Sequence, residues 1–391
     1  MNKNKKLILD VINQRKTLIG IGPMSKNSTD ACIELSDTYD VPMMLIPSRR
    51  QVDSKFLGGG YANNWSTEDF SKYVNKKSIN KKVLLCRDHG GPWQNNVEIE
   101  KKLDLSKAMA SAKSSFENDI DSNFHILHID PSIDIFQSLN IDIILERIYE
   151  LYEHCYDYAK KKNKDILFEI GTEEQSGSTS TFEEIEYFLE KLNIFYIKKK
   201  LPKATFVVIQ CGTKVVETRN IGSFESPLRI IDEVPVEIQL PKTIDICKKY
   251  DVLMKEHNGD YLSDESLLWH PRLGIHAVNV APEFGVAETK SLINILKNLD
   301  SKDLLEKFLH ISYSSKKWKK WLVKDSKISD YEKSIIAGHY VMSDPEVIEL
   351  KKKANSKIKD CRNDIDKILQ SDIKKSIKRY MYYFRLIKNL N

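Results

Sequence analysis

The sequence of 391 residues predicts a (β/α)8 barrel followed by a C-terminal helical appendage. Over the first 300 residues, a short apolar run followed by polar residues and a longer amphipathic stretch occurs eight times, which is the pattern of a strand followed by a helix. Strands that alternate with helices form a parallel sheet covered by helices, and eight such units are enough to close it into a barrel. Beyond about Leu299 the alternation stops and only helical patterns follow. We therefore assign residues 1–300 to the barrel and residues 301–391 to a helical extension packed on it.

The predicted strands are the eight short apolar runs of this repeat. In order they are Thr17–Ile21, Pro42–Ile46, Lys82–Cys86, His125–Ile129, Ile166–Ile170, Thr205–Ile209, Asp251–Lys255 and Gly274–Val280. The stretches between them are helix candidates, and Ile141–Lys161 is the clearest because its apolar residues recur on one face. In the extension, Ser343-Asp344-Pro345-Glu346 predicts a helix start, with a cap residue before a proline at the first helical position.

An open, doubly wound sheet is the structural alternative to the barrel. It would be favoured by a glycine-rich phosphate loop after the first strand. The sequence there, Gly20-Ile21-Gly22-Pro23-Met24, lacks the third glycine and contains a proline. The barrel is therefore the better prediction.

Composition limits the class of protein. Hydrophobic residues make up 41% and charged residues 30%, which indicates a globular chain. Its longest apolar runs are far shorter than the roughly 20 residues that span a bilayer. The six cysteines lack C-x-x-C spacing and the N-terminus lacks signal-peptide features, so we expect a cytoplasmic protein without a membrane partner. Lysines of the basic extension are interleaved with acids and with apolar residues at helical spacing, which favours solvated helices over a nucleic-acid partner.

Polar residues follow six of the predicted strands, at the rim where a parallel barrel carries its chemistry. They are Arg87-Asp88-His89-Gly90-Gly91-Pro92-Trp93, Asp130-Pro131-Ser132, Glu169 with Gly171-Thr172-Glu173-Glu174, Gln210-Cys211-Gly212-Thr213, Glu256-His257-Asn258-Gly259-Asp260-Tyr261, and Asn279-Val280-Ala281-Pro282. Histidines and carboxylates gathered on one rim suit a divalent metal with carboxylate acid–base groups around it.

Other features have plainer interpretations. Asp130 could cap a helix and Gln210 could satisfy a backbone group. Gly58-Gly59-Gly60-Tyr61 is typical of a flexible loop over the rim, with a phosphate cradle as the alternative. The remaining histidines considered are interpreted as packing or surface residues, namely His125, His128, His154, His310 and His339. No H-E-x-x-H or G-x-S-x-G motif occurs, which argues against a zincin or a serine hydrolase.

The order of the rim motifs resembles the class II D-tagatose-bisphosphate aldolase subunits once called non-catalytic, a family that includes ketose-6-phosphate 4-epimerases. The similar pieces are Arg50-Gln51-Val52-Asp53 with Gly59-Gly60-Tyr61, Asp88-His89-Gly90-Gly91-Pro92, His128-Ile129-Asp130, Ile170-Gly171-Thr172-Glu173, Val208-Ile209-Gln210-Cys211-Gly212, Glu256-His257-Asn258-Gly259-Asp260-Tyr261 and Asn279-Val280-Ala281-Pro282. The resemblance covers nearly the whole chain. Departures at Glu217, at Asn258-Gly259 and at Ala281 lie where a phosphate is expected, so the substrate could differ from the standard hexulose 6-phosphate.

The resemblance implies a metal-dependent isomerase that epimerises C4 of a ketose, such as fructose or tagatose 6-phosphate, by a retro-aldol and aldol sequence. It implies a divalent metal, with zinc expected and manganese, cobalt or magnesium as alternatives. The implied metal ligands are His89, His257, Gln210 and Glu173. The implied proton-transfer residues are Asp88 and Glu173. The implied substrate-binding residues are Arg50, Gln51, Asp130, Gln210, Asp260 and Asn279.

Two other functions stay open at this point. The chain could be a stabilising subunit whose partner is a catalytic aldolase subunit, or it could be an aldolase itself. Convergent charged groups at the rim argue against a pure scaffold, and Gln210, where true aldolases have a histidine, argues against aldolase action. The keto sugar is the expected small-molecule partner, and a homo-oligomer is a further possibility.

Overall fold

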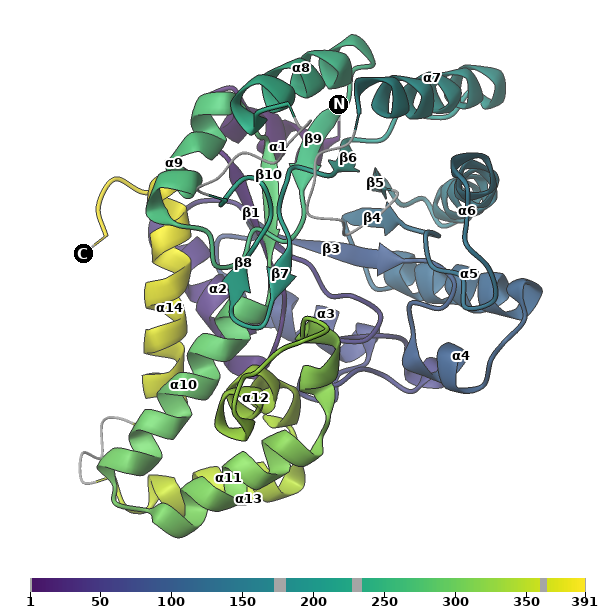
Figure 1. Cartoon of the computed structure of the whole chain (residues 1–391). Helices are drawn as coiled ribbons and strands as arrows, with labels where there is room; N and C mark the ends of the chain where they lie inside the picture. Colours follow the sequence, from purple (N-terminus) through teal and green to yellow (C-terminus); the bar gives the residue numbers. More distant parts are fainter. Residues whose placement is uncertain (1, 172–180, 227–233, 359–363, 391) are drawn as a thin grey trace.

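In the computed structural model, eight parallel strands close into a barrel (Figure 1). The structure describes residues 2–171, 181–226, 234–358 and 364–390. Around the barrel the strands follow the order β1, β10, β9, β6, β5, β4, β3, β2, and β2 pairs with β1 to close the ring. The strands are β1 Leu18–Ile21, β2 Met43–Leu45, β3 Val83–Gly90, β4 Ile126–Ile129, β5 Leu167–Gly171, β6 Phe206–Ile209, β9 Leu253–Glu256 and β10 Ala277–Val280. The fold class predicted from the sequence, a (β/α)8 barrel with C-terminal helices, is confirmed.

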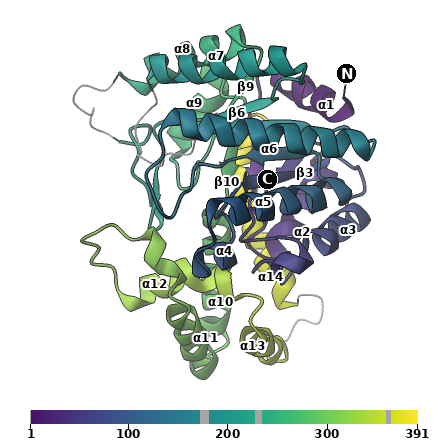
Figure 2. The same ribbon diagram turned by 90° about the vertical axis from the view of Figure 1, so that its right-hand side faces the viewer.

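Helices surround the barrel on its outside (Figures 1 and 2). They are α1 Lys3–Ile12, α2 Lys26–Tyr39, α3 Thr67–Lys77, α4 Asn96–Glu100, α5 Leu105–Asp121, α6 Ile141–Lys161, α7 Phe182–Lys199, α8 Val236–Lys249, α9 Asp264–Leu273 and α10 Pro282–Asn298, with a short 3-10 helix η1 at Lys55–Leu57. A small antiparallel hairpin, β7 Val215–Val216 and β8 Arg219–Asn220, follows β6. The helix predicted at Ile141–Lys161 has those bounds in α6.

Strand β3 is longer than predicted and contains a bulge near its end. Its pairing with β4 shifts register between Arg87 and Gly90, and His89 lies in the left-handed region with φ of 46°. Successive side chains of a strand point to opposite faces. Arg87 therefore points outward and pairs with Asp119 of α5, with both side chains fully buried. Asp88 points into the barrel, so Asp88 and His89 belong to a strand rather than to the loop after it.

The extension consists of helices only. Its elements are α11 Lys302–Ser314, η2 Lys317–Trp321, α12 Asp330–Ala337, η3 Gly338–Val341, α13 Pro345–Asn355 and α14 Ile365–Tyr383. The helix start predicted at Ser343–Glu346 is present, since Asp344 caps α13 and Pro345 is its first residue. Helices α11 to α13 gather below the barrel, whereas α14, yellow in Figure 1, runs back beside α10. Ile373 and Ile377 of α14 belong to the same hydrophobic core as the barrel strands.

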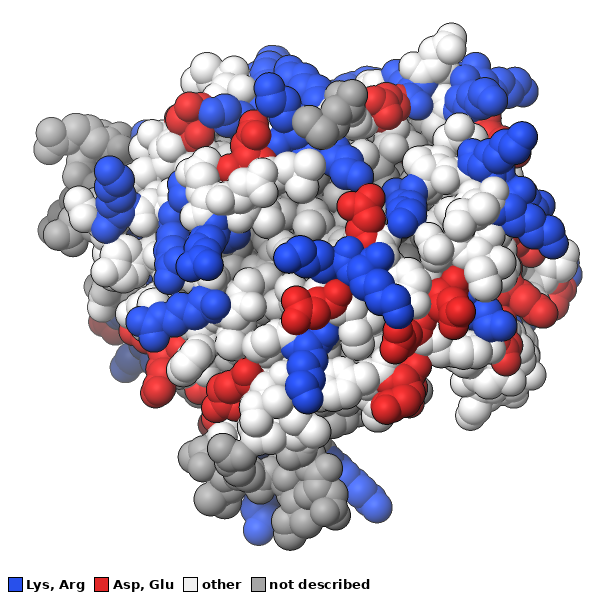
Figure 3. Space-filling model, turned by 90° about the horizontal axis from the view of Figure 1, so that it is seen from above, with Lys and Arg blue, Asp and Glu red and all other residues white. Residues whose placement is uncertain are grey.

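Surface charges on the helices are mixed. In Figure 3, Lys and Arg side chains are scattered with Asp and Glu among them. Examples are the ion pairs Lys199–Glu153 at 2.7 Å and Lys162–Asp121 at 2.9 Å. Such exposed pairs are typical of solvated helices and contribute little to stability. Among the described residues, no helix is long and apolar enough to cross a membrane.

Candidate metal centre at the barrel mouth

Four buried side chains with metal-binding groups meet inside the barrel. Asp88 comes from β3, His128 from β4, Glu169 from β5, and His257 directly follows β9. One oxygen or nitrogen of each lies within 4.8 Å of those of the others. We call these four residues the cluster. All four are at the carboxyl ends of parallel strands, where barrels of this kind carry their sites.

The spacing within the cluster fits a metal better than hydrogen bonds. His257 Nε2 is 3.4 Å from Glu169 Oε1 and 3.7 Å from Asp88 Oδ1. His128 Nδ1 is 3.6 Å from Asp88 Oδ1 and 3.7 Å from Glu169 Oε1. Hydrogen bonds peak near 2.7–3.0 Å. Ligands about 2.0–2.2 Å from a tetrahedral ion lie roughly 3.3–3.6 Å apart, so the donor set fits a cation.

His128 also lacks an ordinary structural explanation. Its ring is fully buried, and Nε2 has no hydrogen-bond partner among the described residues. The other nitrogen, Nδ1, has only a long contact of 3.3 Å with the backbone N–H of His89 and faces the carboxylates of Asp88 and Glu169. A buried polar group without a partner is rare in proteins and calls for an explanation. His128 therefore turns Nδ1, a possible ligand atom, towards the two carboxylates of the cluster.

Lys255 of β9 fixes the orientation of Glu169. Lys255 Nζ is 2.7 Å from Glu169 Oε2, and both side chains are 1% exposed. Glu169 Oε1 is thereby left facing the two histidines. Burial by itself would raise the pKa of Glu169, but Lys255, His128 and His257 outweigh it and lower that pKa to about 2. The cluster thus holds a carboxylate that is ionised at any physiological pH.

Asp88 is held ionised by the imidazoles around it. Burial opposes its charge, but His89, His257 and His128 together keep the pKa of this carboxyl well below its usual range. Asn279 of β10 donates from Nδ2 to Asp88 Oδ1 at 3.1 Å and lies 3.0 Å from His257 Nε2. Asn279 therefore joins two members of the cluster.

His89 lies beside the cluster and pairs with Asp130. His89 Nδ1 is 2.9 Å from Asp130 Oδ2, while Nε2 is 3.6 Å from Asp88 Oδ2. Burial would raise the pKa of Asp130, but the hydrogen bond and charge of His89 lower it below its usual range. Gln94 donates to the same Asp130 oxygen at 2.9 Å. A half-buried histidine oriented by a buried aspartate is an arrangement suited to moving protons.

The structure differs from the sequence analysis at several positions. His128, interpreted as a packing or surface residue, lies in the cluster. Glu169 was one of the rim carboxylates but not one of the implied ligands, and Lys255 was taken as the last residue of a strand; both lie buried inside the barrel. A charged residue within an otherwise apolar run was the available signal for each. Glu173, predicted as a ligand and as a proton carrier, lies outside the described residues.

The other predicted site residues have varied surroundings. Gln210 directly follows β6, and no hydrogen bond joins it to the cluster within the described ranges. Gln51 accepts the backbone N–H of Ser48 in the loop after β2 and donates to Met24 Sδ in the loop after β1. Asp260 accepts hydrogen bonds from the backbone N–H groups of Ala281 and Glu283 at 2.9 and 2.8 Å, which are the contacts of a cap on α10.

The glycine-rich loop is not a phosphate cradle. The backbone N–H groups of Gly58, Gly59, Gly60 and Tyr61 donate to backbone oxygens of Lys55, Ser54, Trp65 and Arg50. A Cβ on Gly60 would lie 2.1 Å from the carbonyl oxygen of Gln51, so only glycine fits there. No N–H group of this loop is left to bind an anion, because each one is used within the turn.

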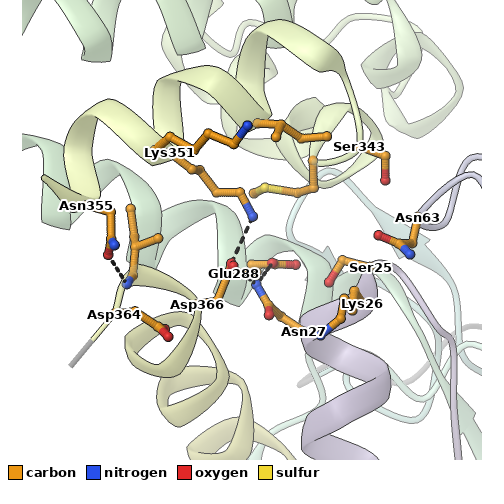
Figure 4. Close-up of a pocket in the computed structure, with 14 residues that line it drawn as sticks. Ser25, Lys26, Asn27, Asn63, Glu288, Ser343, Lys351, Asn355, Asp364 and Asp366 are labelled. Carbon is orange, nitrogen blue, oxygen red and sulfur yellow. Dashed lines mark hydrogen bonds and ion pairs between the residues drawn. The ribbon is translucent and has the colours of Figure 1, made fainter. Parts of the chain in front are cut away.

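A cavity of about 370 Å³ lies between α2, α13 and the start of α14 (Figure 4). Lys351 pairs with Asp366 across it at 2.8 Å, and Asn27 bonds both Glu288 and Asp366 at 2.9 Å. None of the described residues that line it belongs to the cluster. Its charged groups neutralise one another, so the barrel mouth is the better candidate for chemistry.

Comparison with known proteins supports the fold. No family model and no curated protein matches the sequence. A probable tagatose 6-phosphate kinase from Sinorhizobium meliloti 1021 matches with a TM-score of 0.75 at 15% identity, over 94% of this chain and 100% of the other. The chain shares its fold with that protein. The family resemblance seen in the sequence is thereby confirmed at the level of the fold.

Two further structures share the barrel more distantly. A fructuronate-tagaturonate epimerase from Cohnella laeviribosi has a TM-score of 0.60 at 10% identity, over 95% of this chain and 81% of the other. A fructose-bisphosphate aldolase from Campylobacter jejuni has a TM-score of 0.54 at 11% identity, over 98% and 94%. At such low identities the likeness concerns the fold alone.

Proposed function

We propose that this protein is a metal-dependent epimerase that acts at C4 of a ketose, either a ketohexose 6-phosphate such as fructose or tagatose 6-phosphate or a related sugar. The cluster of Asp88, His128, Glu169 and His257 carries the proposal, because two imidazoles and two carboxylates gathered at one place are a donor set for a divalent cation. The names of the proteins that share the fold add support, since they include an epimerase of keto sugar acids and an aldolase.

His128, His257, Glu169 and Asp88 are the residues we propose as ligands. Two nitrogens and two oxygens suit zinc, and manganese, cobalt or magnesium are alternatives. A divalent cation bound there would act as a Lewis acid towards the negative charge that develops on a keto sugar when its carbon chain is cleaved. This ligand set keeps His257 of the sequence analysis and has Asp88, His128 and Glu169 in place of His89, Gln210 and Glu173.

His89 and Asp130 are the pair we propose for proton transfer. In a retro-aldol step, a base takes the proton of the C4 hydroxyl, the C3–C4 bond breaks, and its electron pair passes to C3, next to the C2 carbonyl. Turning the C4 aldehyde over and re-forming the bond inverts C4, and the same base returns the proton. The His89 side chain is 26% exposed, so its Nε2 can reach a bound sugar while Asp130 holds Nδ1. Asp88, which faces His89 through Oδ2, stabilises the protonated imidazole.

Metal analysis followed by NMR of the reaction products tests the proposal. We expect the purified protein to contain about one divalent ion and to interconvert fructose 6-phosphate and tagatose 6-phosphate without releasing trioses. Release of two three-carbon products would instead identify an aldolase. A metal-free protein with no turnover, which nevertheless stabilises an aldolase subunit, would identify a scaffold.

A further inference from the structure

The extension does more than cover the outside of the barrel, because part of it reaches the loops of the mouth. The ring of Tyr340 in η3 packs on the ring of Tyr61, which follows β2, with centroids 4.9 Å apart. Trp321 of η2 donates from Nε1 to the Tyr340 hydroxyl at 3.1 Å. Lys320 Nζ lies 5.3 Å from the Tyr340 ring and 4.6 Å from the Trp321 ring. Tyr340 is therefore fixed in place by its own extension.

A second loop of the mouth holds the same part of the extension. The backbone N–H of Glu217, in the β7–β8 hairpin after β6, donates to the carbonyl oxygen of Trp321 at 2.8 Å. Ser326 donates from Oγ to Glu217 Oε1 at 2.5 Å. Figure 1 shows this hairpin reaching from the barrel towards the extension near α12. The segment around η2 and η3 is thus anchored to the loops after both β2 and β6.

Arg50, next to Tyr61, has a guanidinium without an acidic partner among the described residues. Its neighbour Arg49 is fully buried and pairs with Asp53 at 3.0 Å and with Glu98 at 2.7 Å. In the part of the chain that the structure describes, neither Arg50 nor Lys320 has a carboxylate within ion-pairing distance. Burial lowers the pKa of Arg50, while electrostatic interactions with Tyr340, Tyr61 and Asp130 act in the opposite direction. The backbone oxygen of Arg50 accepts the N–H of Tyr61 at 3.2 Å, which places Arg50 next to the Tyr61–Tyr340 pair.

Tyr261, which follows β9, adds a hydroxyl group to the surroundings of Tyr340. It is buried and has no hydrogen-bond partner among the described residues. Tyr261 interacts electrostatically with Tyr340 and has a left-handed backbone with φ of 60°.

We propose that Arg50, Tyr340 and Lys320, with Tyr61 and Tyr261 beside them, form a subsite for an acidic group on the substrate, a phosphate or a carboxylate. The inference rests on the proposed function in that the acidic group belongs to the ketose. Cations without a carboxylate partner attract an anion, and a guanidinium binds phosphate or carboxylate oxygens in pairs. Arg50 interacts electrostatically with Asp130, which holds His89, so the subsite and the proton-transfer pair belong to the same mouth. The C-terminal extension thereby selects the substrate.

One other role for Arg50 must be distinguished. Arg50 could serve only to balance the charge of Asp130. In that case its replacement would alter proton transfer for every ketose alike. An anion subsite predicts instead a loss confined to acidic ketoses, seen mainly in KM.

Binding of inorganic phosphate to the metal-loaded protein gives a test that needs no turnover. We expect phosphate to raise the melting temperature of the native protein, and Arg50→Gln to weaken phosphate binding about 10- to 100-fold, the typical effect of losing charged hydrogen bonds. Tyr340→Phe, which keeps the ring packing, should weaken it about 3- to 10-fold. Tyr331→Phe, an exposed tyrosine of α12, is the matched control and should change nothing. Unchanged phosphate binding in Arg50→Gln would overturn the subsite.

Kinetics with three ketoses then separate the sources of the acidic group. The substrates are a ketohexose 6-phosphate, a keto-uronate and the neutral ketohexose. We expect Arg50→Gln to raise KM for whichever acidic ketose the native enzyme prefers by about 10- to 100-fold, with little change for the neutral sugar. Equal losses with all three would overturn the subsite in favour of charge balance for Asp130. If the native protein turns over none of them, the proposed function is wrong. Phosphate binding to the native protein and to Arg50→Gln then still tests whether the subsite exists.

Discussion

The two sides of the barrel mouth differ in whether their charged side chains are paired. On the side of the cluster, each charge is buried and has a counter-charge within a few ångströms, as Lys255 has for Glu169 and His89 has for Asp130. On the side of the extension, Lys320 lies over the ring of Tyr340 and Arg50 adjoins Tyr61, and neither cation has a carboxylate within ion-pairing distance among the described residues. The first side pairs its charges internally, whereas the second leaves two cations available to an anion.

This difference follows from where the residues come from. Strands of a closed barrel are fixed by hydrogen bonds on both sides, so the cluster can hold groups to the precision that metal binding and proton transfer need. Loops and 3-10 turns adapt more readily to a change of sequence, which suits recognition of a particular substrate. We therefore expect changes in the cluster to affect metal and turnover, and changes at the extension to affect selectivity.

The largest effect should come from His257→Ala. Loss of one imidazole from a four-ligand site should release the metal and reduce turnover to background, because the remaining groups no longer surround the ion. Metal content and epimerisation are measured together. His310→Ala, an exposed histidine of the extension, is the control and should keep both. Full metal content in His257→Ala would contradict the ligand assignment.

His89→Asn separates the two assignments made for this residue. If His89 transfers protons, turnover should fall about 10²- to 10⁴-fold while the metal is retained. If His89 is a ligand, as the sequence alone suggested, the metal should be lost as well. Metal analysis of His89→Asn beside His128→Ala decides, since the structure predicts loss of metal only from the second variant.

Lys255→Met should destabilise the metal-free protein by about 3–5 kcal/mol, because Glu169 would be left buried and charged without its partner. The double variant Lys255→Met with Glu169→Gln should recover much of this loss, since no unpaired charge remains. Denaturant unfolding measures all three proteins. A decrease of less than about 1 kcal/mol in the free energy of unfolding of the single variant would show that water reaches this pair.

Asp260 provides a test by pH. Burial, with the nearby charge of Glu283, raises the pKa of Asp260 to about 8, against about 3.9 in an unfolded chain. The folded state thus holds a proton that the unfolded state loses, so the stability due to this group is full below about pH 4 and declines as pH rises towards 8. Asp260→Asn keeps an acceptor for the α10 backbone and should show a flatter dependence on pH. An unchanged slope would contradict the raised pKa.

The smallest effect should come from Asp344→Ala in the extension. Asp344 Oδ1 accepts the backbone N–H of Glu346 at 2.8 Å at the start of α13, and loss of such a cap costs about 1 kcal/mol. Selectivity among ketoses should not change, because the cap does not contact Tyr340. A change in selectivity would mean that the whole extension, rather than the few residues at its inner edge, controls the mouth.

The sequence by itself determined the barrel, the change to an all-helical extension, and much of the rim. These depend on local patterns, such as the 3.6-residue period of Ile141–Lys161 and the polar residues at strand ends. Such patterns are visible in the sequence without any knowledge of tertiary contacts. Asp88, His257 and Asn279 were placed correctly at the rim for the same reason.

Only the tertiary structure decided which side chains meet. His128 lies in a strand buried on both faces, where no polar alternation shows which residues point inward. The bulge in β3 turns Asp88 towards the cluster and His89 towards Asp130, and one extra residue in a strand leaves no clear mark in the sequence. Tyr340 is almost 280 residues from Tyr61, and their contact depends on packing of the extension against two loops of the barrel. Contacts over such separations arise from the closed fold as a whole, so the local sequence cannot specify them.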